Sequence, residues 1–325
     1  MRKLIDDVRL IFKCCSLYYQ DGIGQKEICQ ILGISRPTVS RMLSVGKECG
    51  IVKIEIHNPD NLLYGQLERE LEKLFNLQEV IIVPSNSLTE NKSAVNPEIG
   101  RAALKFLTRI LRDGDYVGVS MGTTLQSVAR TDFFIESEVN CTFVPVLGGV
   151  GESRPDLHSN YLAQEFAERF GGKCVQLFAP ALFSKRALLE EFSKEKTILK
   201  VTNLFRKLDA LVMGIGAADP KYSTVLQTGY VDRRSLEIFG ARGAVGDIIL
   251  RYFDADGNTK PFDEFNSRVA GINLSLLKKI QCRVGVAGGE HKVQAVAGAI
   301  KGGYLTVLIT DIDCAQGLLR LGVRS

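Results

Sequence analysis

The sequence predicts an α/β protein with a small N-terminal helix-turn-helix domain and a larger Rossmann-like domain that contains a mainly parallel sheet. Three observations support this prediction. Residues 25–50 contain two short amphipathic segments separated by a glycine, which is the spacing of a helix-turn-helix motif. From about residue 77, short apolar segments alternate with amphipathic helical ones, which is typical of a parallel sheet covered on both faces. The 325 residues are enough for two domains.

Composition and charge are those of an ordinary globular protein with a mildly basic N-terminal end. Hydrophobic residues make up 45% of the chain and charged residues 24%, and the formal net charge is +4. Residues 1–59 hold nine Lys or Arg against six Asp or Glu, so most of the excess positive charge lies there. A basic end is compatible with binding to phosphates, although a solvated helix face explains each charge equally well.

The cysteines and histidines argue against a metal centre, and no cofactor is predicted. The eight cysteines form no C-x-x-C pair, and the three histidines are far apart in the sequence, so a zinc site is not expected. Most cysteines lie in apolar contexts, which favours core thiols of a reduced, cytoplasmic protein. The charged start does not resemble a signal peptide, and no apolar run approaches the ~18–20 residues of a membrane span. We therefore expect no membrane association.

Three helices are expected in the N-terminal domain. Residues 3–20 carry apolar side chains at helical spacing. Residues 25–32 predict a second helix, and Gly33 suits the left-handed position of the turn that follows it. The third helix is expected to begin after Ser35, a favourable N-cap, and to end before Gly50.

The third helix is predicted to enter the DNA major groove. One side carries Val39, Met42 and Leu43, spaced to face a core, while the other side carries short polar or cationic side chains. A helix-turn-helix used only for protein contact is the alternative. The candidate DNA-binding residues are Gln25, Ser35, Arg36, Thr38, Ser40 and Arg41.

Two further elements are expected before the larger domain. Residues 51–58 alternate apolar and polar side chains, which predicts a short strand or wing. Residues 62–75 carry leucines at helical spacing, and such a helix fits two roles, packing on the second domain or connecting and dimerising subunits. The predicted domain boundaries are 1–58 for the helix-turn-helix domain, 59–77 for a linker or oligomerisation helix, and 78–325 for the larger domain.

The larger domain is expected to contain seven strands with helices between most of them. The expected strands are residues 79–83, 115–119, 141–146, 173–177, 210–214, 283–287 and 305–309. The expected helices are residues 98–112, 123–130, 157–170, 188–205 and 292–300. In sheets of this kind, ligands bind outside the carboxyl ends of the strands.

Glycine-rich loops follow four of these strands, at residues 120–124, 148–153, 214–220 and 287–292. Gly122 would let the backbone approach a ligand, while Thr123 and Thr124 would offer hydroxyls and helix N-terminal N–H groups to an anion. One such loop is a weak signal, but four at predicted strand ends favour a pocket for a phosphate or a polyol. None matches the G-x-x-x-x-G-K-[ST] or G-x-G-x-x-G motif.

Several ordered blocks give the chain a resemblance to a known family. They are YYQDGIGQKEICQILGISRPTVSRMLSVGKECGIVKI (18–54), DYVGVSMGTT (115–124), PVLGGVGE (145–152), LQTGYVD (226–232), GAVGDIILRYFDADG (243–257) and VAGGEHKVQAVAGAIKGGYLTVLITD (286–311). Together they resemble the SorC, or sorbitol-operon regulator, family of bacterial transcription factors, and the resemblance covers the chain end to end.

The resemblance implies an N-terminal helix-turn-helix joined to an effector domain similar to the sugar-phosphate isomerase and glucosamine-phosphate deaminase fold. It also implies homodimers or homotetramers that bind operator DNA. A phosphorylated sugar or polyol effector would alter their affinity for that DNA.

The resemblance assigns expected roles to individual residues. It implies that Gly122, Thr123 and Thr124 bind the phosphate of the effector. It implies that Asp247 accepts hydrogen bonds from sugar hydroxyls and that Lys292 makes a charge-assisted contact to phosphate. The remaining residues expected at the effector are Gly148 and Gly149, in the loop after the third strand, and Gln227.

One position departs from the pattern of the family. Some relatives carry Lys or Arg just before the paired glycines after the third strand, where this chain has Leu147. A Schiff base or a guanidinium contact from that position is therefore not available. We expect an effector other than deoxyribose-5-phosphate or a bisphosphate bound in that manner.

An enzyme of sugar-phosphate isomerisation or deamination is the alternative function. Such catalysis needs a base beside a carbonyl carbon and an acid for its oxygen. The eligible side chains are Asp219, Asp247, Asp254, Asp256, Glu290 and His291. Asp254 and Asp256, however, lie in the predicted turn FDADG, where aspartate is common for structural reasons. Because similarity of fold does not carry function, no catalytic residue is predicted.

Overall fold

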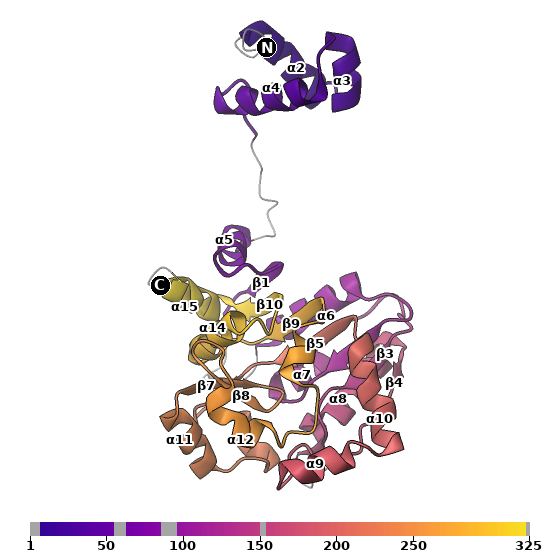
Figure 1. Cartoon of the computed structure of the whole chain (residues 1–325), viewed down its shortest axis with the longest axis vertical. Coiled ribbons are helices and arrows are strands. Elements are labelled where there is room, and N and C mark those ends of the chain that lie inside the picture. Colours follow the sequence, from indigo (N-terminus) through magenta and orange to yellow (C-terminus); the bar gives the residue numbers. More distant parts are fainter. Residues whose placement is uncertain (1–6, 55–62, 86–95, 150–153, 323–325) are drawn as a thin grey trace. The chain divides into compact units, whose positions relative to one another are not determined.

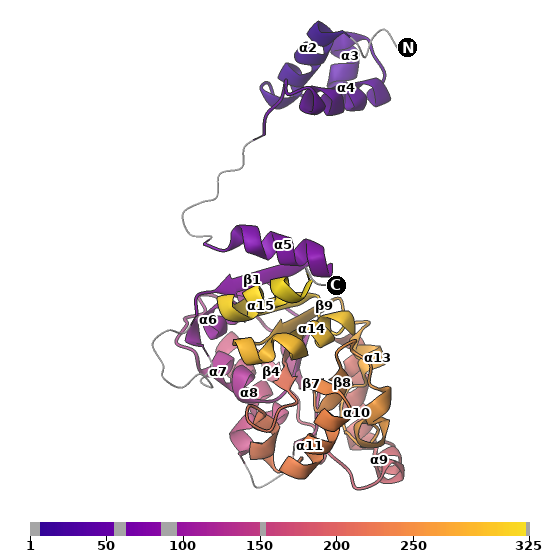
Figure 2. The ribbon, with the colours of Figure 1, turned by 90° about the vertical axis from the view of Figure 1, so that its left-hand side faces the viewer.

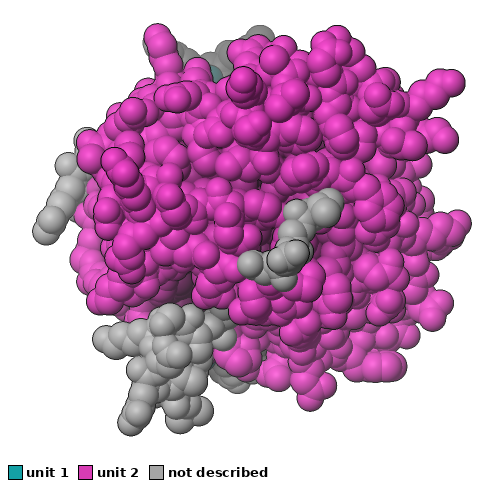
Figure 3. All heavy atoms as spheres, turned by 90° about the horizontal axis from the view of Figure 1, so that it is seen from below, with its two compact units in different colours: residues 1–63 teal, residues 64–325 magenta. Residues whose placement is uncertain are grey.

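The computed structural model describes residues 7–54, 63–85, 96–149 and 154–322. The chain divides into two compact units, residues 1–63 and residues 64–325, which are coloured separately in Figure 3. Each unit has a hydrophobic core of its own, which is the physical mark of a domain.

The smaller unit has helices α2 (Val8–Tyr19), α3 (Gln25–Leu32) and α4 (Arg36–Glu48), which confirms the three predicted helices (Figure 1). Gly33 ends α3 in the left-handed conformation, with φ 65°, and Ser35 is the N-cap of α4, both as predicted. The core of this unit takes side chains from all three helices: Ile11, Cys14, Cys15, Ile28, Val39, Met42 and Leu43.

The predicted strand over residues 51–58 is wrong for its described part, residues 51–54. The Val52 N–H donates to the Gly46 carbonyl at 3.0 Å, and Ile51 and Val52 pack against the core, so the chain folds back on the end of α4. A strand needs a neighbouring strand for its backbone hydrogen bonds, and the described part of this unit has none. Residues 55–58 lie outside the described residues.

The larger unit is built on a parallel sheet in the strand order β1-β10-β9-β5-β2-β3-β4. Its strands are β1 (Glu79–Val83), β2 (Tyr116–Val119), β3 (Thr142–Pro145), β4 (Lys173–Cys174), β5 (Ala210–Gly214), β9 (Cys282–Val286) and β10 (Val307–Asp311). These correspond to the seven predicted strands, although β4 has only two residues. Since the strands are parallel, their carboxyl ends lie at one edge of the sheet.

Helices cover both faces of this sheet (Figures 1 and 2). On one face, α6 (Pro97–Ile110), α7 (Thr123–Arg130) and α8 (Ser159–Phe170) share a core with the strands. On the other face, α14 (Val293–Lys301) and α15 (Ile312–Gly322) contribute to a second core. Helix α15 is absent from the sequence prediction, whereas the other four helices are expected.

Helix α5 (Gly65–Phe75) packs on the larger unit, where Leu71 is fully buried. The Glu68 carboxylate accepts a hydrogen bond from the Ile82 N–H at 2.9 Å, and Glu72 accepts one from the Val80 N–H at 3.0 Å. Because β1 is an edge strand, these carboxylates satisfy donors that have no strand partner. The packing role of this helix is confirmed, and its role in dimerisation stays a prediction.

A second sheet, antiparallel and in the order β6-β7-β8, is absent from the sequence prediction. It consists of β6 (Gly216–Ala217), β7 (Ala244–Ile248) and β8 (Arg251–Asp254), and α11 (Arg233–Ala241) precedes β7. β6 has only two residues, and a glycine interrupts the apolar pattern of β7, so these strands carry little periodic signal.

The predicted helix over residues 188–205 is wrong as a single element. The structure has α9 (Arg186–Phe192), α10 (Lys196–Thr202) and a 3-10 turn (Asn203–Lys207) instead. The Ser193 hydroxyl donates to the Leu189 carbonyl at 2.6 Å, and Glu195 has extended backbone angles, so the first helix ends before the second begins. The remaining short elements are helices α12 (Asp263–Asn266) and α13 (Leu274–Leu277) and 3-10 turns Pro155–Leu157, Thr224–Thr228, Lys260–Phe262 and Glu290–Lys292.

Candidate functional site

A small pocket of about 40 Å³ lies in the larger unit, where the loops that follow β2 and β5 meet. The 3-10 turn Thr224–Thr228, strand β7 and the turn before α14 complete its walls. Ligands of open parallel sheets bind at this edge. The structure brings five of the predicted effector-binding residues into the lining of this pocket: Gly122, Thr123, Thr124, Asp247 and Lys292.

One wall of the pocket is the N-terminus of α7. Gly122 has φ 116°, a conformation that favours glycine, and its N–H donates to the Leu157 carbonyl at 3.0 Å. Thr123 and Thr124 follow as the first two residues of the helix and are half-buried. The N–H groups of a first helical turn have no partner within the helix, so this wall offers donors and a positive dipole end to an anion.

Lys292 supplies a cation to the same pocket. Its side chain is only 9% exposed, and Nζ donates to the Ile215 carbonyl at 2.9 Å. Burial lowers the pKa of Lys292, while Asp247 acts in the opposite direction. The preceding turn is fixed because the Gly289 N–H donates to both oxygens of Asp311, at 2.8 and 3.0 Å.

Asp247, on β7, faces this cation without forming an ion pair with it. The carboxylate is 5% exposed, Oδ1 has no hydrogen-bond partner among the described residues, and no salt bridge to Lys292 forms within 4.0 Å. Burial raises the pKa of Asp247 to about 6, against the opposing effect of Lys292. Gly216 is required beside it, because a Cβ at that position would collide with the carboxylate. The pocket therefore holds an unsatisfied acceptor, which is costly unless a ligand donates to it.

Aliphatic side chains that the sequence reasoning missed form another part of the lining. Ile249 and Leu250 join β7 to β8 with φ 53° and 59°, and both are almost fully buried. Two-residue turns with positive φ normally contain Asn or Gly, so the local sequence carries no signal for this turn. Thr228, also in the lining, is missed as well, although it directly follows the predicted Gln227.

The structure does not bring Gly148, Gly149 and Gln227 into this pocket. Each glycine has a packing reason: a Cβ on Gly148 would collide with the carbonyl oxygens of Ala179 and Pro180, and one on Gly149 would collide with the His158 ring. Gln227 is exposed, and its Oε1 accepts a hydrogen bond from Arg154 at 3.2 Å.

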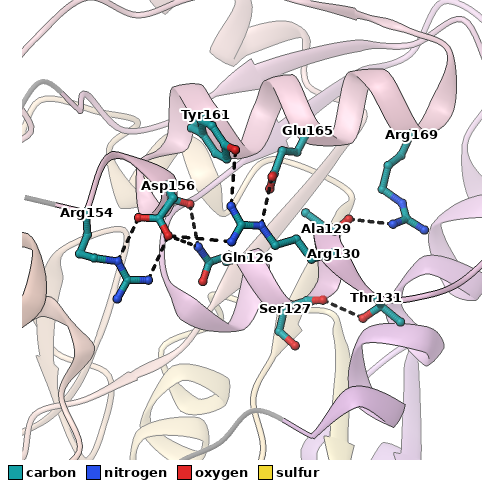
Figure 4. A network of polar contacts seen from close by, with 10 residues as sticks. All are labelled: Gln126, Ser127, Ala129, Arg130, Thr131, Arg154, Asp156, Tyr161, Glu165 and Arg169. Atoms are coloured by element: carbon teal, nitrogen blue, oxygen red, sulfur yellow. Dashed lines mark hydrogen bonds and ion pairs between the residues drawn. The ribbon is translucent and has the colours of Figure 1, made fainter.

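A network of polar side chains joins α7 to the turn Pro155–Leu157 and to α8 (Figure 4). Asp156 accepts hydrogen bonds from Arg154 Nε and Nη2, both at 3.0 Å, and from Gln126 Nε2 at 2.5 Å. Arg130, at the end of α7, donates to Glu165 on α8 at 3.2 Å. Arg154 is the main cause that lowers the pKa of Asp156 to about 2. The sequence reasoning missed this network, for which the pair of opposite charges at 154 and 156 was the available signal.

The predicted DNA-binding residues lie in the smaller unit at the start of α3 and along α4. Ser35, Arg36, Ser40 and Arg41 are exposed, and neither arginine forms an ion pair with another residue in the described part of the chain. Thr38 is half-buried and shares a 2.8 Å hydrogen bond with the Ser35 hydroxyl. Gln25, the first residue of α3, is also half-buried. The helix thus presents a polar and cationic face opposite its buried face.

Two classes of site have no support in the described ranges. No three His, Cys, Asp or Glu side chains of residues 7–54, 63–85, 96–149 and 154–322 come together as a metal-binding group. Over the same ranges, no helix combines the length and the apolar character that a membrane crossing requires.

Comparison with known proteins relates most of the chain to sugar-binding regulators. Residues 62–320 match the family described as "Putative sugar-binding domain". The "Deoxyribonucleoside regulator" of Bacillus subtilis (strain 168) is 30% identical over 311 residues, which cover 96% of this chain and 97% of that protein. The "Transcriptional regulator LsrR" of Escherichia coli (strain K12) is 32% identical over 309 residues, which cover 93% of this chain and 92% of that protein.

Solved structures show the same similarity. The full-length Sorbitol Operon Regulator SorC from Klebsiella pneumoniae superposes with a TM-score of 0.70 at 28% identity, covering 97% of this chain and 99% of that chain. The "Putative Sugar-Binding Domain of Transcriptional Repressor" from Vibrio fischeri superposes with a TM-score of 0.70 at 26% identity, covering 80% of this chain and 99% of that chain.

Proposed function

Because the chain belongs to the SorC family of sugar-responsive transcriptional regulators, we propose that its pocket binds a phosphorylated sugar or polyol and that α4 contacts operator DNA. The proposed effector-binding residues are the five that line the pocket. The proposed DNA-binding residues are Gln25, Ser35, Arg36, Thr38, Ser40 and Arg41. Effector binding would then change the affinity of the protein for its operator.

The observation that carries this proposal is that the pocket has groups that attract an anion on some walls and a carboxylate on another. Lys292 and the N-terminus of α7 attract a phosphate, while the Asp247 carboxylate in the same lining accepts from a hydroxyl. The volume of about 40 Å³ holds only a few water-sized groups, so it suits the phosphate end of the ligand. Leu147 is fully buried and is not part of the pocket lining, and a leucine can supply neither a Schiff base nor a guanidinium contact.

A thermal-shift screen of the full chain with phosphorylated and free sugars and polyols tests the effector proposal. We expect a phosphorylated ligand to raise the melting temperature of the parent and to have no such effect on Lys292→Ala. Lys301→Ala, at the end of α14, removes an exposed lysine and is the matched control. Equal stabilisation of Lys292→Ala and the parent by the same ligand would refute the role of Lys292.

Retained catalysis is the competing function, and the arrangement of the eligible side chains argues against it. Of the six candidates, only Asp247 lines the pocket. Asp254 accepts hydrogen bonds from the backbone N–H groups of Asp256 and Asn258, and the His291 ring stacks on Tyr222 at 4.6 Å between centroids. None of the other five candidates is therefore placed beside Asp247 as a second acid or base. Turnover of a ligand found in the screen would favour the enzyme instead.

The proposed assembly is a homodimer or a homotetramer in the cytoplasm. A single short recognition helix reads few base pairs, so a symmetric protein with spaced half-sites is expected for operator recognition. Sedimentation of the full chain with and without operator DNA tests this. A monomer that binds the operator with full affinity would contradict it.

A further inference from the structure

A second and larger cavity, about 800 Å³ in volume, lies in the larger unit and opens to solvent. Its lining residues come mainly from helices α9, α10, α12 and α13 and from the segments next to them. It shares no lining residue with the pocket around Lys292. Its volume is in the range of pockets that hold small organic ligands, about 300–1,000 Å³.

The cavity contains a buried arginine with an unused donor. Arg251, on β8, is 7% exposed, and its Nη2 donates to the carbonyl oxygens of Val269 at 3.1 Å and Gly271 at 3.3 Å. Nη1 has no hydrogen-bond partner among the described residues. Burial lowers the pKa of Arg251 to about 10, and no carboxylate opposes that effect. A guanidinium with five donors in this position lacks the anion that buried arginines usually have.

The other lining residues divide the cavity into an apolar body and an acidic rim. Leu189, Phe192 and Leu274 provide half-buried apolar surface. Three exposed carboxylates, those of Glu190, Asp263 and Glu264, also line it, and Glu190 is paired with Arg186 at 2.7 Å. The uncompensated positive charge is therefore deep in the cavity, and the negative charges are at its mouth.

We propose that this cavity binds a small organic monocarboxylate, with its carboxylate on the Arg251 guanidinium and its apolar body against Leu189, Phe192 and Leu274. One carboxylate balances the one uncompensated cation and receives a charge-assisted hydrogen bond. A phosphate monoester carries about −1.5 to −2 charge and would leave excess negative charge beside an acidic rim. The site is separate from the proposed sugar-phosphate pocket and does not depend on it.

The test uses the full chain and two probe pairs, hexanoate with hexanamide and benzoate with benzamide, at millimolar concentrations. We expect the carboxylates to bind in ligand-observed NMR titrations and to raise the melting temperature, while each amide of the same shape binds at least about tenfold more weakly. Lys292→Ala should retain this binding, which separates the result from any failure of the sugar-phosphate proposal. Absence of binding by both carboxylates, or equal binding of the amides, would overturn the proposal.

Two variants locate the binding site. Ser193→Phe adds a ring at a lining position and leaves Arg251 unchanged, and Thr197→Phe adds the same ring at an exposed position of α10 outside the lining. Carboxylate binding should be lost in the first and kept in the second. Arg251→Lys keeps the charge but not the planar fork, and should weaken binding about tenfold or more. Parent-like binding by Ser193→Phe would overturn the proposal, even where Arg251→Lys does not fold.

Discussion

At the scale of single residues, Lys292 and Asp247 line the same pocket without satisfying each other. Lys292 donates to a backbone carbonyl instead, and one oxygen of Asp247 has no partner in the described part of the chain. Both groups are buried, so water does not compensate them fully. This arrangement leaves binding capacity for a ligand with both an anionic group and a hydroxyl, at some loss of stability in the free protein.

Replacing Asp247 by Asn should change how stability depends on pH. Burial raises the pKa of Asp247 from 3.8 to about 6, so the folded protein holds this proton more tightly than the unfolded chain does. The protonated Asp247 therefore stabilises the folded protein fully below pH 3.8, the pKa of Asp247 in the unfolded chain. This contribution is lost as the pH rises through about 6. The shift corresponds to a contribution on the order of 3 kcal/mol.

Chemical denaturation of the parent and Asp247→Asn at about pH 4 and about pH 7 measures this effect. We expect Asp247→Asn to gain stability relative to the parent as pH rises. Asp256→Asn, which changes a carboxylate that is 80% exposed, is the control. The same stability difference between parent and Asp247→Asn at both pH values would show that Asp247 does not titrate as described.

Arg41 is the residue of α4 from which we expect a clear loss of operator affinity. It is exposed and unpaired in the described structure, so its guanidinium is available to a base edge or a phosphate. Arg41→Ala should weaken binding by about 1–3 kcal/mol if it contacts a guanine. Gel-shift titrations should show little change for Lys13→Ala, which removes an exposed cation from α2. Unchanged affinity of Arg41→Ala would remove this residue from the interface.

At the scale of secondary-structure elements, the start of α7 depends on the backbone of one glycine. Gly122 has φ 116°, and nothing lies within 4 Å of a Cβ built there, so Gly122→Ala adds backbone strain without a steric clash. We expect a loss of about 1–3 kcal/mol in the free energy of unfolding and weaker stabilisation by the effector. Gly240→Ala, in helix α11, meets only ordinary packing and is the control. Unfolding titrations that show equal stability for both variants would contradict this role of Gly122.

The elements that the sequence predicted have a strong local signal. Strand β1 (EVIIV) and helix α7 (TTLQSVAR) have the predicted bounds because an apolar run and a helical repeat are readable without knowledge of the fold. The β7–β8 turn is the opposite case. Ile249 by itself favours strands and Leu250 favours helices, and both are buried in the larger unit in a turn with positive φ.

The residues of the candidate site also fall into those with a local sequence signal and those without one. Gly122, Thr123 and Thr124 could be placed in the pocket because a glycine and two threonines open a helix directly after a strand. The separation of Gln227 from the pocket depends on its contact with Arg154, and the packing of Gly148 depends on the carbonyl of Ala179. Both contacts join segments far apart in the sequence, so no local pattern contains them.

At the scale of the whole molecule, the protein combines two units with separate cores and separate proposed ligands. If the effector changes operator affinity by a given factor, operator DNA changes effector affinity by the same factor, because linkage is reciprocal. A coupling of about 1–3 kcal/mol corresponds to a change of roughly 5- to 150-fold. The proposed function requires only this amount of coupling.

The most direct test of the account is a fluorescence-anisotropy titration of the full chain against DNA from its own upstream region, with and without the sugar phosphate found in the screen. The account predicts that this ligand changes the operator affinity of the parent by about fivefold or more. It also predicts that Lys292→Ala binds the operator as the parent does without ligand and no longer responds to the ligand. An equal response of the parent and Lys292→Ala, or no response of either, would contradict it.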